Sequence, residues 1–171
     1  MKTLYLMCGM PFSGKTTLAK AIAKHLDSSY ISLDEINEAR GLCGGDGIPV
    51  AEWEQTHFLA MEQLRSLVQS RRDIVVDDTS CFRWLRSRFS NFVRQYDYQT
   101  TIVFLDIPLS TIQNRIEQNE QTKIRHRVKQ DIIEQMAKTF ELPQPDENVI
   151  KYRANQPIDK WIAEHLVVSI D

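Results

Sequence analysis

The chain has 171 residues, which is the length of one ordinary globular domain and too short for two typical catalytic domains. Its formal net charge of -2 excludes a global basic field that would hold nucleic acid non-specifically, although a local basic patch could still exist. The three cysteines, Cys8, Cys43 and Cys81, lack metal-site spacing, and no apolar run approaches the roughly 18 residues of a membrane span. We therefore expect one cytoplasmic domain over residues 1–171, with reduced thiols and no membrane partner.

The first elements in the chain are predicted to be a strand, a tight loop and a helix. The apolar run TLYLMC (3–8) stops at a glycine, and KTTLAKAIAKHL (15–26) repeats leucine or isoleucine every four residues, as one face of a helix does. Between them, GMPFSGKT (9–16) is a full match to G-x-x-x-x-G-K-[ST], the Walker A pattern. The sequence therefore predicts a phosphate-binding loop between the first strand and the first helix.

Such a loop binds phosphate because consecutive backbone N–H groups and a helix N-terminus converge on the anion, while the lysine adds a positive charge. A chance match is the alternative, but the strand before the loop and the helix after it are the context that the motif requires. The hydroxyl of Thr16 is expected to reach Mg²⁺. Nucleotide contacts are predicted from Gly9, Met10, Pro11, Phe12, Ser13, Gly14, Lys15, Thr16 and Thr17.

Further apolar runs are predicted to be strands, with helical patterns between them. The strands are YISL (30–33), DIVVD (73–77), TTIVFLD (100–106) and NVIKY (148–152). Helices are predicted at 50–71, at 82–96, from Pro108, across Val128, Ile132, Met136 and Phe140, and after Pro157. Apolar strands joined by helices form a parallel sheet covered on both faces, so we predict an α/β fold. Ligands of such sheets bind beyond the carboxyl ends of the strands.

Aspartates follow two of these strands. Asp34 comes directly after the second strand, and Asp77 and Asp78 close the third. Carboxylates at this edge of a parallel sheet can hold Mg²⁺ or its water shell, which makes Asp77 and Asp78 candidate metal ligands together with Thr16. One of the two aspartates could instead only cap the helix that follows.

The motifs together resemble the P-loop kinases related to polynucleotide 5'-hydroxyl kinase, a group that includes zeta-toxin-like and chloramphenicol-phosphotransferase-like enzymes. The matching segments span most of the chain: GMPFSGKTTLAKAI, ISLDEINEARGL, VVDDTSCFRWLR, NEQTKIRHRV and LPQPDE. The resemblance implies a P-loop NTPase fold like that of the nucleoside-monophosphate kinases, with a small helical lid at about residues 115–130. It also implies ATP and Mg²⁺ as cofactors.

The resemblance assigns a role to Asp34, which matches the aspartate that acts as base toward an acceptor hydroxyl in these kinases. Asp34 could alternatively cap the short helix after it, or serve in both roles. The segment DDT (77–79) resembles the Asp-Thr-Asn element of the group, with Ser80 in place of the asparagine, and Asp78 is the better match of the two aspartates. The metal site is therefore expected at Asp78, with Asp77 as the alternative.

A basic stretch from Arg115 to Lys129 is either a solvated face or the lid. A cation that arrives only when a lid closes would stabilise the charge that develops during phosphoryl transfer. The resemblance places arginines in such a lid, so Arg125 is predicted to be catalytic along with Lys15 and Asp34. Arg115 is expected at the base of the lid, in contact with the nucleotide. Relatives usually carry a further arginine where this chain has Glu120.

Three features concern the acceptor. Phe12 stands where most relatives have glycine, and we predict that its ring faces the acceptor side of the cleft. Arg83, Arg86 and Arg94 lie within about 80 degrees of one another on a helix, so they either bind an acceptor phosphate or face solvent. The glycine-rich segment GLCGGDGIP (41–49) is either a connector or a mobile segment that closes over the acceptor.

These observations predict an ATP-dependent phosphotransferase that moves the γ-phosphoryl group to a hydroxyl. A polynucleotide 5'-hydroxyl, a nucleoside and a small molecule are all admissible acceptors. The alternative is a nucleotide-dependent switch or ATPase module that acts on a protein partner, because a phosphate loop indicates nucleotide binding and not transfer. The matches at Asp34 and in the lid favour the kinase.

Overall fold

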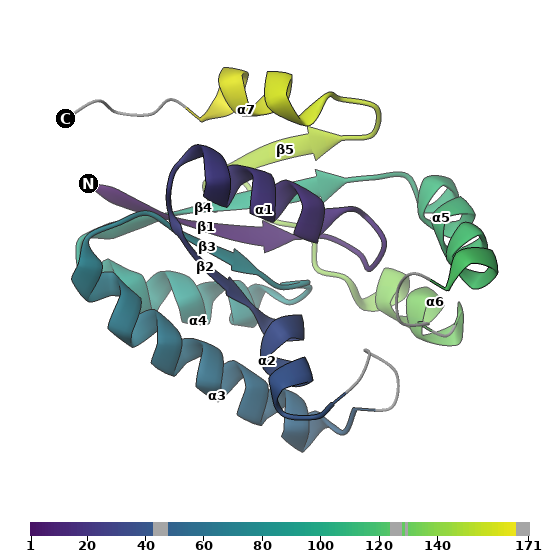
Figure 1. The fold of residues 1–171 in the computed structure, drawn as a ribbon, viewed down its shortest axis with the longest axis horizontal. Coiled ribbons are helices and arrows are strands. Elements are labelled where there is room, and N and C mark those ends of the chain that lie inside the picture. Colours follow the sequence, from purple (N-terminus) through teal and green to yellow (C-terminus); the bar gives the residue numbers. More distant parts are fainter. Residues whose placement is uncertain (43–47, 124–127, 129, 167–171) are drawn as a thin grey trace.

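A parallel β-sheet forms the centre of the computed structural model, which describes residues 1–42, 48–123, 128 and 130–166 (Figure 1). Five strands pair in the order β2-β3-β1-β4-β5. They are β1 (Lys2–Cys8), β2 (Ser29–Ser32), β3 (Ile74–Asp77), β4 (Tyr98–Asp106) and β5 (Val149–Arg153). The apolar first strand is the middle one, and Leu4 lies opposite Ile74 of β3 and Thr100 of β4.

Helices cover both faces of the sheet because successive side chains of each strand point to opposite faces. On one face, Leu4 and Leu6 pack against α3 (Val50–Leu67) and α4 (Arg83–Arg94). On the other, Met7 packs with residues of α1 (Lys15–His25) and α7 (Ile158–His165). Figure 1 shows this sandwich, with α2 (Leu33–Ala39), α5 (Leu109–Thr122) and α6 (Gln130–Thr139) toward the carboxyl ends of the strands. The predicted α/β sandwich is confirmed.

Several predicted boundaries were wrong by one to four residues. Leu33 begins α2 instead of ending β2, because Ser32 caps the helix with its side-chain oxygen. The strand β4 begins at Tyr98, which is buried and lies opposite Lys2 although the surrounding residues are polar. The helix α3 ends at Leu67, where a short 3-10 turn (Val68–Ser70) follows.

The lid predicted at about residues 115–130 is only partly covered by the described residues. The helix α5 includes Arg115 and ends at Thr122, and α6 begins at Gln130. Residues 124–127 and 129 lie outside the described part, so the lid stays a prediction. Along the described ranges, no helix combines the length and the apolar character needed to cross a membrane.

Candidate active site

The phosphate loop lies at the middle of the sheet's carboxyl edge, between β1 and α1. Phe12 and Gly14 both have left-handed backbones, with φ of 61° and 101°. A Cβ atom on Gly9 would lie 3.1 Å from both Leu105 Cβ and Ser13 Oγ, which is tighter than side chains normally pack. The Gly9 N–H donates to the carbonyl of Thr79 at 3.1 Å. This bond ties the start of the loop to the segment that follows β3.

Two polar side chains of the loop, Ser13 and Lys15, are placed to bind a ligand. The hydroxyl oxygen of Ser13 is buried, and within the described chain it has no hydrogen-bond partner. Lys15 Nζ donates to the carbonyl of Met10 at 3.0 Å, so its ammonium folds back over the loop. Burial lowers the pKa of Lys15, and the charges of nearby aspartates oppose that shift. A phosphate in the loop would satisfy both side chains, because it is anionic and accepts hydrogen bonds.

Arg115 holds the loop from the α5 side. Its Nη1 donates to the carbonyls of Phe12 and Ser13, at 2.9 and 2.8 Å. The guanidinium is also close to Gly14, since a Cβ atom there would lie 3.6 Å from Arg115 Nη1. The sequence predicted Arg115 at the nucleotide, and the structure places it against the backbone of the predicted phosphate loop.

Asp77 and Asp78 lie at the end of β3, and each is already held by a neighbouring side chain. Asp77 is buried, and its Oδ2 accepts from the hydroxyl of Tyr30 at 3.0 Å. Asp78 Oδ2 accepts from the N–H and the hydroxyl of Ser80, at 3.0 and 3.1 Å. Neither aspartate caps α4: the first N–H of that helix, on Arg83, donates to Glu141 Oε2 at 2.6 Å. The capping alternative for these aspartates was therefore wrong.

Asp34 lies in the first turn of α2, and the side chain that caps this helix belongs to Ser32. Ser32 Oγ accepts from the N–H of Glu35 at 3.3 Å. Partial desolvation raises the pKa of Asp34, and the negative charges of Asp77 and Asp78 raise it further against the opposing charge of Lys15. Asp34 thus shares one electrostatic environment with the loop lysine and the β3 aspartates. A carboxylate with a raised pKa holds a proton more readily, as a general base must.

The described residues also fit a magnesium ion that arrives with a nucleotide. No three His, Cys, Asp or Glu side chains among them gather closely enough to hold a metal alone. Mg²⁺ in proteins commonly keeps several waters and binds one or two carboxylates plus substrate phosphates. Asp77, Asp78 and the hydroxyl of Thr16, in the first turn of α1, are oxygen donors of that kind.

A cavity of about 440 Å³ lies on the other side of the phosphate loop from these aspartates. That volume is within the range of small-molecule sites. Phe12 to Gly14, Thr17, Leu18, Arg115, Gln118, Asn119, Thr122, Tyr152 and Ile158 line it. Because β1 is the middle strand, the cavity lies on the side of β4 and β5. Asp34, Asp77 and Asp78 lie at the carboxyl ends of β2 and β3, on the other side of β1. Phe12 lines this cavity, and its predicted contact with the acceptor stays a prediction.

Other candidate residues lie elsewhere. Arg125 lies outside the described residues, so its predicted role stays a prediction. Arg83 and Arg94 are exposed, as the solvent-facing alternative predicted, although Arg83 also forms an ion pair with Asp146. Arg86 is fully buried and bound to Glu147, so it matches neither the acceptor-phosphate nor the solvent-facing alternative. Sequence reasoning missed Tyr30 and Tyr152. Tyr152 lies one residue before the carboxyl end of β5, which was an available signal, but nothing in the local pattern connects Tyr30 with Asp77.

Comparisons with known proteins agree with this architecture. The model of the AAA domain family matches residues 4–143. A gluconokinase from Sinorhizobium meliloti is 17% identical, with a TM-score of 0.64 over 95% of this chain and 88% of that one. The Mycobacterium tuberculosis APS kinase CysC, in complex with AMPPNP and APS, is 17% identical, with a TM-score of 0.66 over 95% and 94%.

A third solved structure shares the same architecture. Kti12 from Chaetomium thermophilum, in complex with ADP-AlF3, is 14% identical, with a TM-score of 0.71 over 94% of this chain and 96% of that one. At such identities the likeness concerns the fold, and it confirms the resemblance to P-loop kinases that the motifs indicated. The chain belongs to the AAA domain family and has the fold of the P-loop kinases.

Proposed function

We propose that the protein is an ATP-dependent phosphotransferase that moves the γ-phosphoryl group to an acceptor hydroxyl. One observation carries the proposal: Asp34 lies in the first turn of α2, directly after β2, at the same carboxyl edge of the parallel sheet as Lys15 of the phosphate loop, and the charges of the two side chains interact. A phosphate loop alone is enough for a nucleotide switch, whereas a carboxylate with a raised pKa beside the loop lysine suits transfer to a hydroxyl.

The nucleotide is proposed to lie across the phosphate loop, with its base toward Tyr152 and its phosphates toward Lys15. The cavity beside α5 has the volume for a base, and the loop offers backbone N–H groups, the ammonium and the Ser13 hydroxyl. Mg²⁺, held by Thr16 and by Asp78 or Asp77, would neutralise charge on the β- and γ-phosphates. Solved relatives of the same fold contain AMPPNP or ADP-AlF3.

In the transfer step, Asp34 is proposed to orient the acceptor hydroxyl in line with the γ-phosphate. The acceptor oxygen forms a bond to the γ-phosphorus, the bond from that phosphorus to the β–γ bridging oxygen breaks, and ADP leaves with the electron pair. The hydroxyl proton passes to the Asp34 carboxylate. Lys15 stabilises negative charge on the transferred group, and Arg125 of the predicted lid adds a second cation.

The test is transfer of label from γ-labelled ATP to a panel of acceptors. The panel contains RNA and DNA with 5'-hydroxyl ends, nucleosides, and aminoglycoside-like or phenicol compounds. We expect labelled product from one class, and we expect Asp34→Asn to remove most of it. ATP consumption that is the same with and without every acceptor, with no labelled product, would favour the nucleotide-dependent switch.

A further inference from the structure

The segment after β3, which carries Asp78, is held in place by a buried arginine. Arg86 lies in the first turn of α4, and its side chain is fully buried. Its Nη1 donates to the carbonyl of Ser80 at 2.9 Å. Ser80 in turn donates its N–H and its hydroxyl to Asp78 Oδ2, at 3.0 and 3.1 Å. Only Ser80 therefore separates the guanidinium from a carboxylate that we assign to the metal site.

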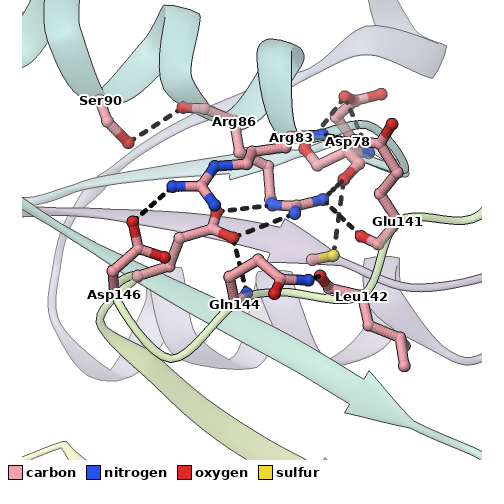
Figure 2. Close-up of polar contacts among 11 residues, drawn as sticks. Asp78, Arg83, Arg86, Ser90, Glu141, Leu142, Gln144 and Asp146 are labelled. Atoms are coloured by element: carbon pink, nitrogen blue, oxygen red, sulfur yellow. Dashed lines mark hydrogen bonds and ion pairs between the residues drawn. The ribbon is translucent and has the colours of Figure 1, made fainter.

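The same guanidinium binds the segment that joins α6 to β5 (Figure 2). Nη1 also donates to the carbonyl of Glu141 at 2.9 Å, while Nε and Nη2 donate to the two carboxylate oxygens of Glu147, at 2.7 and 3.1 Å. Glu147 is itself largely buried, and its Oε2 also accepts from the N–H of Gln144 at 2.8 Å. Arg86 thus joins the segment between β3 and α4 to the segment between α6 and β5, which lies more than 50 residues further along the chain.

Only arginine has the geometry for this position. The planar guanidinium presents several N–H donors in fixed directions, and here it serves two carbonyls and a bidentate carboxylate at once. A lysine would keep the charge but could not reproduce this fork. Ser80 itself has a φ of 47°, in the left-handed region that non-glycine residues adopt uncommonly.

The segment held by Arg86 also reaches the phosphate loop. Thr79, one residue before Ser80, accepts the hydrogen bond from the Gly9 N–H at 3.1 Å. In addition, the thiol of Cys8 donates to the Ser80 carbonyl at 3.5 Å. Residues 78–80 are therefore held by hydrogen bonds both to the start of the loop that would bind the phosphates and to Arg86.

We propose that Arg86 is a positioning residue that sets Asp78 at the correct place relative to the phosphate loop, and that Glu147 fixes Arg86 for this purpose. The inference rests on the proposed function, because it takes Asp78 to serve the Mg²⁺ of a bound nucleotide. Neither Arg86 nor Glu147 touches the substrates. Their effect reaches the reaction through the backbone and hydroxyl of Ser80.

The test uses Arg86→Lys and Glu147→Gln in the full chain. We expect the affinity for Mg²⁺ in the presence of ADP to fall by about 10- to 100-fold, as is common when the partners of a metal ligand are altered. ADP binding without Mg²⁺ should be unchanged, because the phosphate loop is intact. Deuterium exchange of the amides in residues 78–82 should become faster, and this readout needs no nucleotide.

Asp146→Asn is the matched control. It removes the ion pair between Arg83 and Asp146, which links the same helix to the same segment without contacting Ser80. We expect this variant to leave both the Mg²⁺ affinity and the exchange at residues 78–82 as in the wild type. If the two test variants behave like this control, and only their unfolding temperature falls, Arg86 is purely structural and the proposal is wrong.

The outcomes separate this proposal from the proposed function. Should Arg86→Lys fail to fold, Glu147→Gln decides the question, since it keeps Arg86 and one acceptor oxygen. A wild type that binds ADP with Mg²⁺ but phosphorylates no acceptor would contradict the proposed function and leave the positioning role standing. A wild type that binds no nucleotide would contradict the phosphate-loop assignment, and unchanged exchange at residues 78–82 would then still overturn the role of Arg86.

Discussion

Lys15 is the residue on which nucleotide binding is expected to depend. Its ammonium is bonded only to the loop carbonyl of Met10 among the hydrogen bonds described, so it is available to turn toward phosphate oxygens. Lys15→Ala should weaken ADP binding by about 10- to 100-fold, which is the value of a hydrogen bond to a charged group, and should abolish transfer. Calorimetric titration with ADP measures the change.

The control for this experiment is Lys20→Ala. Lys20 lies on the same helix, but it is exposed and pairs with Glu35 at 2.9 Å. Its removal should leave ADP affinity as in the wild type. Equal losses in both variants would mean that the general charge of α1, and not a phosphate contact of Lys15, governs binding.

Asp34 is the residue that separates a kinase from a switch. Asp34→Asn keeps the size of the side chain but cannot accept the proton, so kcat should fall by about two to four orders of magnitude with ADP affinity unchanged. The same substitution should leave ATP hydrolysis unaltered in a switch. Full transfer activity in the variant would mean that Asp34 is not the base.

The pKa of Asp34 predicts how this activity depends on pH. Because the base must be ionised and its pKa is raised, kcat should fall on the acid side at a higher pH than for an ordinary aspartate, and Asp34→Asn should lack this limb. The stability of the fold changes with pH in the opposite direction to the activity. A carboxyl whose pKa is raised in the folded state favours folding at low pH, and this contribution to stability is lost as pH rises through the folded-state pKa. Thermal unfolding of the variant at pH 7 should therefore not be earlier than that of the wild type.

For single residues, the sequence predicts where in the fold a residue lies better than it predicts which residues it contacts. The strand ends placed Lys15, Asp34 and Asp78 at one edge of the sheet, because a phosphate loop and apolar runs are local signals. The sequence suggested Asp34 as a possible cap of the helix that follows it. The helix in fact begins at Leu33, so Ser32 is the capping residue. The bond from Tyr30 to Asp77 spans 47 residues, and no local pattern encodes it.

Among the elements, α2 and α3 are joined by a buried polar cluster beside the glycine-rich segment. Thr56 Oγ1 is fully buried and accepts from Arg40 Nη1 at 2.6 Å, and it is also bonded to Asn37 Oδ1. Arg40 additionally forms an ion pair with Glu52. These contacts fix the two helices that flank residues 43–47, which lie outside the described part of the chain. Whether that segment closes over an acceptor stays a prediction.

Thr56→Val tests this junction. Valine has nearly the same shape but can neither donate nor accept, so Asn37 and Arg40 would each lose a buried partner. The free energy of unfolding should fall by about 1–3 kcal/mol, as measured by urea denaturation. Thr139→Val is the control, because within the described part of the chain the Thr139 hydroxyl bonds only to carbonyls of its own helix, on an exposed face. A loss for Thr56→Val no larger than for this control would contradict the role of the cluster.

The elements themselves could be predicted from apolar periodicity, whereas their connections could not. Residues 82–96 have the pattern of an amphipathic helix, and α4 covers Arg83–Arg94. The same pattern places Arg86 at the border of the apolar face, yet the side chain is fully buried. Its partner Glu147 lies 61 residues further along the chain, so the reason for this burial is visible only after the fold brings them together.

For the whole molecule, the strand order divides the cleft. Apolar runs alone do not specify which strand is central, so the sequence could not say which side of the phosphate loop each residue would occupy. The order β2-β3-β1-β4-β5 puts Asp34 and Asp78 on one side of β1, and Arg115 and Tyr152 on the other. Because Phe12 lines the cavity on the second side, we now expect it to affect the nucleotide and not the acceptor.

Phe12→Ala tests this division. Losing the apolar contact of the ring with the nucleotide should raise the KM for ATP by about tenfold, which corresponds to roughly 1.4 kcal/mol, while the acceptor KM stays unchanged. Phe12→Gly separates the ring from the backbone, since φ at this residue is 61° and glycine adopts that conformation without strain. Both variants should show the same KM change, with the glycine variant at least as stable as the alanine variant. A rise in the acceptor KM alone would instead place the ring against the acceptor, as the sequence first indicated, and would reverse the assignment of the two sides of the cleft.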